Sequence, residues 1–359
     1  MPTDLDLTIR LHDVVARPFR TPPPTRPALL TVLDRVACRD AVSGHLVGVT
    51  DGIHWGWWGP VDADTATTAR RMFERVAPNR PGTPDWWVRR LRGSTRHGHA
   101  GVLGISAGVV ELACWDLLGQ RHGVPVWRLS ARRAGRADVP AYATCFGLRL
   151  DDRTAPAVVT EVRARWPVQK WRPVRRLTKP GSAARAACAA AGPGGLALDF
   201  GGRWPVGRAC SLAAHLPEPA AFLEEPVAPG EWAQTAPRSW PAPLAAGEHL
   251  YGLDDAAVLD AADVDIWQPD AVFCGGSASF GAIAAAARSC GRQVYAHGGG
   301  LVPAVHAAVA GVPVDAVEVH LVLEPRRQAH LTAPVLPDGS GSLPVPTAPG
   351  WGGALRADL

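Results

Sequence analysis

The sequence has little of several features that would assign it to a particular class of protein. Its seven cysteines are an odd number without a Cys-x-x-Cys pair, which favours reduced, mostly buried thiols over a disulfide framework or a zinc site. The formal charge is only +4, and no basic run is interleaved with aromatic residues, so nucleic-acid binding is not expected. The first residues lack a basic segment before an apolar core, and we find no apolar run of about 18 residues. We therefore expect a cytoplasmic protein that does not enter a membrane.

Lysine is also scarce. Of the 37 basic residues only Lys170 and Lys179 are lysines, and the others are arginines. Because arginine has replaced lysine almost everywhere, a remaining lysine is a candidate for a role that requires an ammonium group. Lys170 ends a short apolar run and has Arg172 two residues on, on the same face of an extended chain. These cations could bind a substrate carboxylate and stabilise the negative charge of an enolate, although a surface position is the usual one for lysine.

What the sequence does contain is enough apolar material for a large enzyme. With 359 residues, 47% hydrophobic and 19% charged, the chain can bury a barrel and a second, smaller domain. Residues 1–135 predict an α+β capping domain. Alternating runs at 5–9 and 46–50 predict a small antiparallel sheet, with a turn at Asp51-Gly52, and apolar residues at helical spacing predict a helix over 105–120.

Residues 136–330 repeat a different pattern, in which a short apolar run is followed by a loop and an alanine-rich helical stretch. Eight runs of this kind predict parallel strands, and their number favours a closed α/β barrel over an open sheet. The remaining residues, 331–359, are rich in proline and glycine and are expected to fold back onto the cap. The eight predicted strands are 141–146, 168–171, 196–199, 222–224, 244–247, 266–268, 294–296 and 317–319.

Three carboxylates follow consecutive predicted strands. Asp199, Glu224 and Glu248 each end an apolar run, and the C-terminal ends of barrel strands meet at one mouth. Three like charges at one point repel one another, and a hard divalent cation such as Mg²⁺ would relieve that repulsion. Any one of these acids could instead cap a helix or pair with an arginine, but three in register favour a metal site.

Three further polar residues follow the last predicted strands. Asp270 and His297 end the sixth and seventh strands, so the carboxylate could fix the imidazole in one tautomer and make it a general base. A structural histidine on a polar loop is the alternative, since the chain has twelve histidines and Gly298-Gly299-Gly300 would then be only a flexible turn. Glu318, on the eighth strand, could donate a hydrogen bond to a substrate carboxylate if its acidic neighbours keep it protonated.

Taken together, these motifs resemble the enolase superfamily, of the mandelate racemase and muconate lactonizing enzyme type. The resemblance covers nearly the whole chain and implies a modified TIM barrel of the (β/α)7β kind with an N-terminal α+β cap. The segments that carry it are Glu111-Leu112-Ala113-Cys114-Trp115-Asp116-Leu117, Leu198-Asp199-Phe200-Gly201-Gly202-Arg203, Phe222-Leu223-Glu224-Glu225-Pro226, Ala246-Gly247-Glu248-His249, Gln268-Pro269-Asp270, Cys274-Gly275-Gly276 and Ala296-His297-Gly298.

The resemblance implies a role for each of these residues. The Mg²⁺ ligands would be Asp199, Glu224 and Glu248, the base would be His297 with Asp270, and Lys170 and Glu318 would stabilise an enediolate formed by loss of the proton α to a carboxylate. The motifs are most similar to those of acid-sugar dehydratases such as rhamnonate and galactonate dehydratases. The implied reaction is therefore loss of water from a sugar acid to give a 2-keto-3-deoxy acid.

Two departures from the dehydratase pattern leave other outcomes open. Gly201 occupies the position where galactonate dehydratases have a general-acid histidine, and Arg172 replaces the second lysine of many relatives, which disfavours a two-base racemase. An epimerase, a cycloisomerase or a non-catalytic Mg²⁺ and carboxylate-binding barrel are the alternatives. We expect a homo-oligomer that binds a small carboxylate. The candidate substrate-binding residues are Arg172, Arg203, Arg20 and Trp55.

Overall fold

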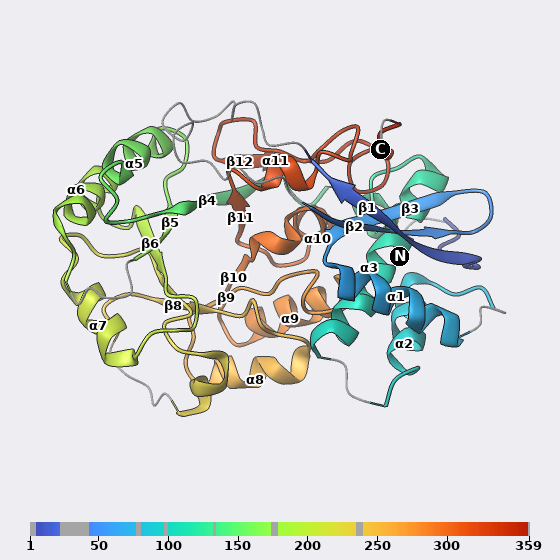
Figure 1. Cartoon of the computed structure of the whole chain (residues 1–359), viewed down its shortest axis with the longest axis horizontal. Coiled ribbons are helices and arrows are strands. Elements are labelled where there is room, and N and C mark those ends of the chain that lie inside the picture. Colours follow the sequence, from blue (N-terminus) through green and yellow to red (C-terminus); the bar gives the residue numbers. More distant parts are fainter. Residues whose placement is uncertain are drawn as a thin grey trace.

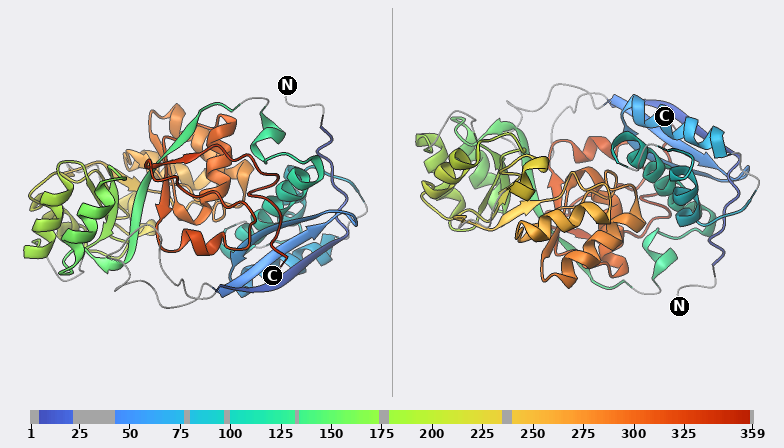
Figure 2. Two further views of the ribbon diagram at one scale, coloured as in Figure 1. Left: turned by 90° about the horizontal axis from the view of Figure 1, so that it is seen from above. Right: turned by 90° about the horizontal axis from the view of Figure 1, so that it is seen from below.

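The chain forms a three-stranded cap and a closed barrel that lie side by side (Figure 1). The computed structural model describes residues 5–21, 43–76, 80–96, 100–131, 134–173, 179–234 and 240–357, and of residues 145–148, 233 and 234 it describes only the backbone. In two further views the cap is at one end of an elongated molecule, and the C-terminal segment reaches the cap sheet (Figure 2).

The cap contains an antiparallel sheet of three strands in chain order. Its strands are β1 (Asp13–Arg20), β2 (Ser43–Thr50) and β3 (Trp55–Val61), followed by α1 (Ala63–Val76), α2 (Pro84–Arg92), α3 (Gly101–His122) and α4 (Trp127–Ser130). The prediction of a strand over 5–9 was wrong. Within that stretch Ile9 makes one isolated bridge with Gly82, because no neighbouring strand continues the hydrogen bonding.

The predicted helix over 105–120 is confirmed as the central part of α3. The helix ends at Gly123, whose φ of 65° is the left-handed conformation that glycine readily adopts at a helix end. Contrary to our expectation, α3 does contain an 18-residue window apolar enough to cross a membrane, with a mean hydropathy of 1.6. Since 72% of that window is buried inside the protein, the apolar composition of α3 serves a core helix.

Eight parallel strands close into the barrel, as the sequence predicts. Each strand pairs with the next along the chain, and β11 also pairs with β4, which closes the ring. Every predicted run overlaps one of these strands. The strands are β4 (Asp138–Arg149), β5 (Gln169–Arg172), β6 (Leu196–Asp199), β7 (Leu223–Glu224), β8 (Leu244–Ala246), β9 (Ile266–Trp267), β10 (Gln293–Ala296) and β11 (Ala316–His320).

Helices connect the strands on the outside of the barrel (Figure 1). They are α5 (Ala155–Arg163), α6 (Ser182–Ala191), α7 (Val206–Ala214), α8 (Leu253–Ala261), α9 (Ser277–Ser289) and α10 (Leu301–Ala310). In the described part of the connection between β7 and β8 there is a 3₁₀ helix, η2 (Pro229–Gln234), in place of an α-helix. A second 3₁₀ turn, η3 (Gly298–Gly300), precedes α10, and α11 (Glu324–Arg327) follows β11.

The cysteines whose side chains are described are all free. Three of these five are buried, one is half-buried and Cys290 is exposed. Burial raises the pKa of the Cys114 thiol well above its usual range, which disfavours the reactive thiolate. The buried thiols Cys114, Cys188 and Cys274 therefore contribute to packing.

The cap and the barrel meet where α3 crosses the loop before α9. A Cβ atom on Gly108 would lie 2.3 Å from the carbonyl carbon of Gly275, so only a residue without a side chain permits this approach. Beside it the Glu111 carboxylate accepts a hydrogen bond of 2.9 Å from the backbone N–H of Ser277, at the N-terminus of α9. Burial raises the pKa of Glu111 to about 7. A helix of the cap thus caps a helix of the barrel at the mouth of the barrel.

The C-terminal segment packs between the two parts. Strand β12 (Ser342–Pro344) pairs antiparallel with β4, and further on the Trp351 indole N–H donates to the carbonyl oxygen of Leu112 in α3 at 2.8 Å. His306 of α10 contacts the Trp351 ring, with 5.0 Å between ring centroids, and its Nδ1 lies 3.2 Å from the backbone nitrogen of Trp127. Burial lowers the pKa of His306 to about 3, so the imidazole packs in its neutral form.

We expect the close approach at Gly108 to be required for stability. Gly108→Ala should lower the free energy of unfolding by about 1–3 kcal/mol, because the added methyl group meets backbone atoms. Gly281→Ala, in open space within α9, should raise it by up to about 1 kcal/mol by restricting the unfolded chain. Urea unfolding of the two variants measures both changes, and equal effects of the two substitutions would contradict the docking role.

We expect His306 to make stability depend on pH. Because its pKa falls from 6.5 to about 3 on folding, its contribution is complete above pH 6.5 and is lost as the pH falls toward 3. His306→Gln should reduce the slope of unfolding free energy against pH by up to about 1.4 kcal/mol per pH unit between pH 6 and 4. The exposed His215→Gln is the control. An unchanged slope for His306→Gln would rule out this titration.

Candidate active site

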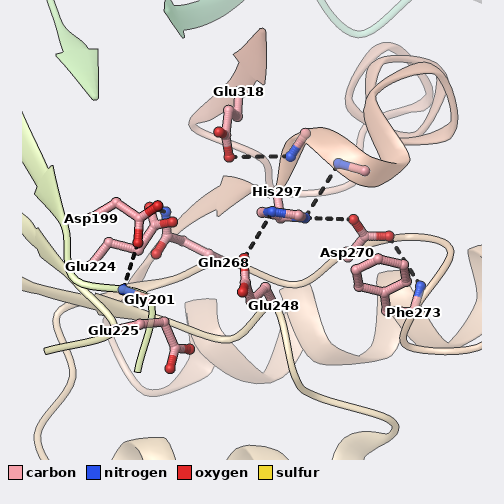
Figure 3. Close-up of polar contacts among 12 residues, drawn as sticks. Asp199, Gly201, Glu224, Glu225, Glu248, Gln268, Asp270, Phe273, His297 and Glu318 are labelled. Carbon is pink, nitrogen blue, oxygen red and sulfur yellow. Dashed lines mark hydrogen bonds and ion pairs between the residues drawn. The ribbon is translucent and has the colours of Figure 1, made fainter. Parts of the chain in front are cut away.

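The residues singled out in the sequence come together at the C-terminal ends of the barrel strands. Asp199 and Glu224 are the last residues of β6 and β7 and are register partners. Glu248 follows β8 by two residues, and His297 directly follows β10. Figure 3 shows their side chains around one opening, with His297 between Glu248 and Asp270.

His297 and Asp270 form a hydrogen-bonded pair. The Nδ1 atom of His297 lies 2.7 Å from Oδ2 of Asp270, and its Nε2 lies 2.9 Å from Oε2 of Glu248. The other carboxylate oxygen of the fully buried Asp270 accepts from the backbone N–H groups of Val272 and Phe273 at 2.8 and 3.0 Å. Burial by itself would lower the pKa of His297, but the two carboxylates outweigh it and raise the pKa well above its usual value. The ring is thus fixed in orientation from both sides.

The glycines after His297 are needed for this geometry. A Cβ atom on Gly299 would lie 2.3 Å from Oδ2 of Asp270, and one on Gly300 would lie 2.7 Å from the backbone nitrogen of Ala271. Larger residues would therefore displace the carboxylate from the imidazole. The Gly298-Gly299-Gly300 run is a condition for the His297–Asp270 contact and more than a flexible turn.

Lys170 is buried between two glutamates. Its Nζ lies 2.5 Å from Oε1 of Glu224 and 2.8 Å from Oε1 of Glu318, and its side chain is only 2% exposed. Burial opposes the charge of Lys170, but the two carboxylates raise its pKa well above the usual value. One ammonium can neutralise only one of two buried carboxylates. Glu318 takes that role, and burial together with the other acids raises the pKa of Glu224 to about 8.

The condition under which Glu318 could donate a hydrogen bond, protonation favoured by its acidic neighbours, is not met in this arrangement. Burial alone would raise its pKa, but Lys170 and His297 outweigh burial and hold the pKa well below its usual value. Its Oε2 accepts from the Tyr142 hydroxyl at 3.4 Å and from the backbone N–H of Gly298 at 3.3 Å. Glu318 is thus an ionised acceptor that positions Lys170.

Arg172 binds the first carboxylate of the predicted metal triad. Its Nε lies 2.7 Å from Oδ2 of Asp199, and the other oxygen, Oδ1, accepts from the backbone N–H of Gly201 at 2.7 Å. Gly201 and Gly202 both have φ near +60° (59° and 61°), a conformation that most residues avoid. The chain therefore turns sharply after Asp199 and leaves the mouth free of a side chain at position 201.

The three predicted metal ligands do not converge on one point in this arrangement. Asp199, Glu224 and Glu248 are each paired with a different cation, namely Arg172, Lys170 and His297. Among the described residues, no three acidic, histidine or cysteine side chains are arranged to hold a metal ion. The expected convergence was wrong for these side-chain positions, because each carboxylate is turned toward a different cationic residue of the chain itself.

The donor set nevertheless fits Mg²⁺. Strands β6, β7 and β8 are hydrogen-bonded neighbours, so their three carboxylates start from adjacent strand ends. All the donors are oxygen atoms, as hard divalent cations prefer. Three carboxylates from adjacent strand ends are thus the kind of donor set that such an ion takes.

Two cavities flank these residues. The arginine cavity, of about 380 Å³, is lined by Arg149, Arg172, Arg203, Asp199, Glu248 and His249, together with neighbouring residues. The cap cavity, of about 210 Å³, lies between the cap and the barrel and is lined in part by Trp57, Trp58, Phe273, Gly299, Glu324 and Arg327. The arginine cavity is within the size range of small-molecule sites, and the cap cavity is smaller.

Only two of the four candidate substrate-binding residues lie at a cavity of the site. Arg172 and Arg203 line the arginine cavity. Arg20, the last residue of β1, is exposed, and Trp55, 41% exposed, stacks on Trp57 with 5.3 Å between ring centroids. Neither Arg20 nor Trp55 is among the described lining residues of the two cavities.

Two buried polar residues at the site, Gln268 and Tyr142, had no role predicted from the sequence. Gln268 donates from Nε2 to Oε2 of Glu224 at 2.6 Å and to the Tyr142 hydroxyl at 3.2 Å. These contacts position Glu224 from the side opposite Lys170. Gln268 was quoted only as part of a motif, and its place two residues before Asp270 was the available signal. Tyr142 lay within a predicted strand without any distinguishing neighbour.

A family model described as enolase C-terminal domain-like matches residues 156–359 of the chain. The protein therefore belongs to the enolase superfamily, in its mandelate racemase and muconate lactonizing enzyme group. Solved structures of this group have the same cap and barrel along nearly their whole length.

Three of these structures illustrate the range of activities described for similar folds. A racemase from Streptomyces coelicolor A3(2) with bound magnesium is 23% identical, with a TM-score of 0.74 and coverage of 96% of this chain and 97% of the other. The 3,6-anhydro-D-galactonate cycloisomerase from Zobellia galactanivorans is 21% identical, with a TM-score of 0.75 and 97% coverage of both chains. A protein from Mesorhizobium loti, provisionally assigned as a dehydratase, is 19% identical, with a TM-score of 0.74 and coverage of 98% and 97%. Because the sequence identities are below 25%, the similarity to these structures establishes only the fold.

The buried lysine should be essential for stability. Lys170→Met leaves Glu224 and Glu318 buried without a cation, and should lower the free energy of unfolding by about 3–5 kcal/mol. Lys179→Met, at the only other lysine and exposed, should change it by less than about 0.5 kcal/mol. Chemical unfolding at pH 7 measures both, and a small effect of Lys170→Met would mean that the two glutamates accept protons without strain.

Proposed function

We propose that the protein abstracts the proton α to a carboxylate with His297 as the base, and that the product is a 2-keto-3-deoxy acid formed by dehydration of a sugar acid. The observation that supports this most strongly is the position of His297, held by the fully buried Asp270 and facing the mouth that Lys170 and Glu318 also face. A fixed base opposite a fixed cation is the arrangement that enolate formation requires.

Mg²⁺ would be held by Asp199, Glu224 and Glu248. When bound, it would supply positive charge that stabilises the enediolate form of the substrate carboxylate. The cations that now pair with these acids would then be released toward the substrate. For Lys170 this means that its ammonium, still positioned by Glu318 at 2.8 Å, can donate to a substrate oxygen.

His297 would act twice. In the neutral form that it would take once Glu248 no longer pairs with Nε2, the ring would accept the α-proton at Nε2 while Nδ1–H donates to Asp270, which stabilises the resulting imidazolium. The same Nε2–H would then protonate the leaving β-hydroxyl, because Gly201 provides no acid on the other side. The C–H and C–O bonds break, water leaves, and the resulting enol converts to the 2-keto acid. Arg172 is a poor base at neutral pH, which makes racemisation from the opposite face unfavourable.

The proposal is tested by measuring α-proton exchange and loss of water in the presence of Mg²⁺. The protein with Mg²⁺ should exchange the α-proton of at least one sugar acid in D₂O and release a 2-keto acid detectable with semicarbazide. His297→Asn should lower both by about 10²–10⁴-fold, and His215→Asn, an exposed histidine away from the site, should not. Addition of a chelator should abolish both signals.

The outcomes distinguish the alternatives. Exchange with an isomeric product and no keto acid would identify an epimerase or a cycloisomerase. Binding of acids without exchange of any α-proton would identify a non-catalytic barrel. Full activity in the presence of the chelator would exclude the assigned role of the carboxylate triad.

A further inference from the structure

Three neighbouring strands each contribute an arginine to one cavity beside the proposed metal ligands. Arg149 is the last residue of β4, Arg172 is the last residue of β5, and the two are register partners. Arg203 follows the end of β6 in the turn after Asp199. All three line the arginine cavity, whose volume is about 380 Å³. Arg172 and Arg203 were predicted from the sequence to bind substrate, and Arg149 was not.

Positive charge dominates this cavity. Its lining includes three arginines against two carboxylates, Asp199 and Glu248, and both carboxylates belong to the triad assigned to Mg²⁺. Arg172 pairs with Asp199, whereas the Arg149 guanidinium has no hydrogen bond or ion pair with any residue in the part of the chain that the structure describes. Guanidinium groups bind carboxylate and phosphate oxygens in a bidentate manner, and clustered cations concentrate anions in a cleft.

The cap cavity, on the other side of His297, is different. Its arginine, Arg327, lies 3.5 Å from Oε2 of the buried Glu324 and donates to the carbonyl oxygen of Gly298 at 3.0 Å. Tryptophan, phenylalanine and leucine side chains make up much of the remaining wall. A second anionic group of a substrate therefore has a more favourable environment in the arginine cavity.

We propose that the substrate is a dianionic acid, whose carboxylate next to the reacting carbon faces Lys170 and whose remote anionic group, a second carboxylate or a phosphate, is bound in the arginine cavity by Arg149 and Arg203. This inference rests on the proposed function and specifies its substrate class. Arg149 is then a specificity-determining residue that contacts the remote end of the substrate and takes no part in the transfer of protons.

The experiment compares acids that differ only at the remote end. Hexonic acids, the matching hexaric acids and the matching hexonic acid 6-phosphates are assayed with the Mg²⁺-loaded protein for kcat and KM. The wild type should prefer one of the two dianionic series by at least ten-fold in kcat/KM. Arg149→Gln should reduce that preference by at least ten-fold, mainly through KM, because each lost charge-assisted contact weakens binding. The two dianionic series separate a carboxylate from a phosphate.

Arg153→Gln is the matched control, since Arg153 is exposed four residues beyond Arg149 and does not line the cavity. It should leave the preference unchanged. Equal kcat/KM for hexonic and dianionic acids, or a loss in Arg149→Gln that is the same for all three series, would overturn the proposal.

A binding measurement keeps the test independent of turnover. Thermal unfolding with each acid should show a larger rise in Tm for the preferred dianion than for the hexonic acid, and Arg149→Gln should remove that difference. If no acid is turned over but this difference is seen, the proposed reaction fails and the anion site stands. If no dianion raises Tm more than its hexonic partner, the anion site fails whatever the activity.

Discussion

Mutual compensation of charge at the barrel mouth is the constraint on which the site depends. Four acids end or follow β6 to β9 and a fifth lies within β11, and leaving them uncompensated in a buried setting would cost far more than the net stability of a domain. Three cations contact these acids, namely Lys170 and Arg172 of β5 and His297 after β10, and Glu224, whose pKa is raised to about 8, needs no cation of its own near neutral pH. Binding and catalysis must therefore proceed by exchange of partners among groups that are already paired. The acids are Asp199, Glu224, Glu248, Asp270 and Glu318.

This exchange requires a rigid frame, and the frame extends into the cap. The approach of α3 to the loop before α9 at Gly108, and the capping of α9 by Glu111, fix the segment that begins with Asp270. The same segment supplies the two backbone N–H groups that bind one oxygen of Asp270. A helix of the cap thus contributes to the orientation of His297 without touching it.

The barrel could be predicted from the sequence because two signals agree, namely the regular spacing of the apolar runs and the polar residue that ends each run. Short apolar runs ended by a polar residue recur at nearly constant spacing, and the carboxylates at 199, 224 and 248 therefore fall at strand ends. Pairing between side chains was not predictable in the same way. The charge of Glu318 depends on Lys170, which lies about 150 residues earlier in the chain, and no local pattern encodes that distance. In the cap, alternation at 5–9 suggested a strand, but a strand also needs a partner, which only the tertiary fold supplies.

The left-handed turn after Asp199 has a further consequence for how such a site can diversify. The φ of 59° at Gly201 is accessible at low cost to glycine and, among other residues, mainly to asparagine, aspartate and histidine. Only 3.7 Å separates a Cβ atom at this position from the Asp199 carboxylate, so a side chain placed here would begin beside that carboxylate. A single backbone dihedral angle thereby restricts position 201 to residues that either leave the barrel mouth open or place a polar group beside Asp199.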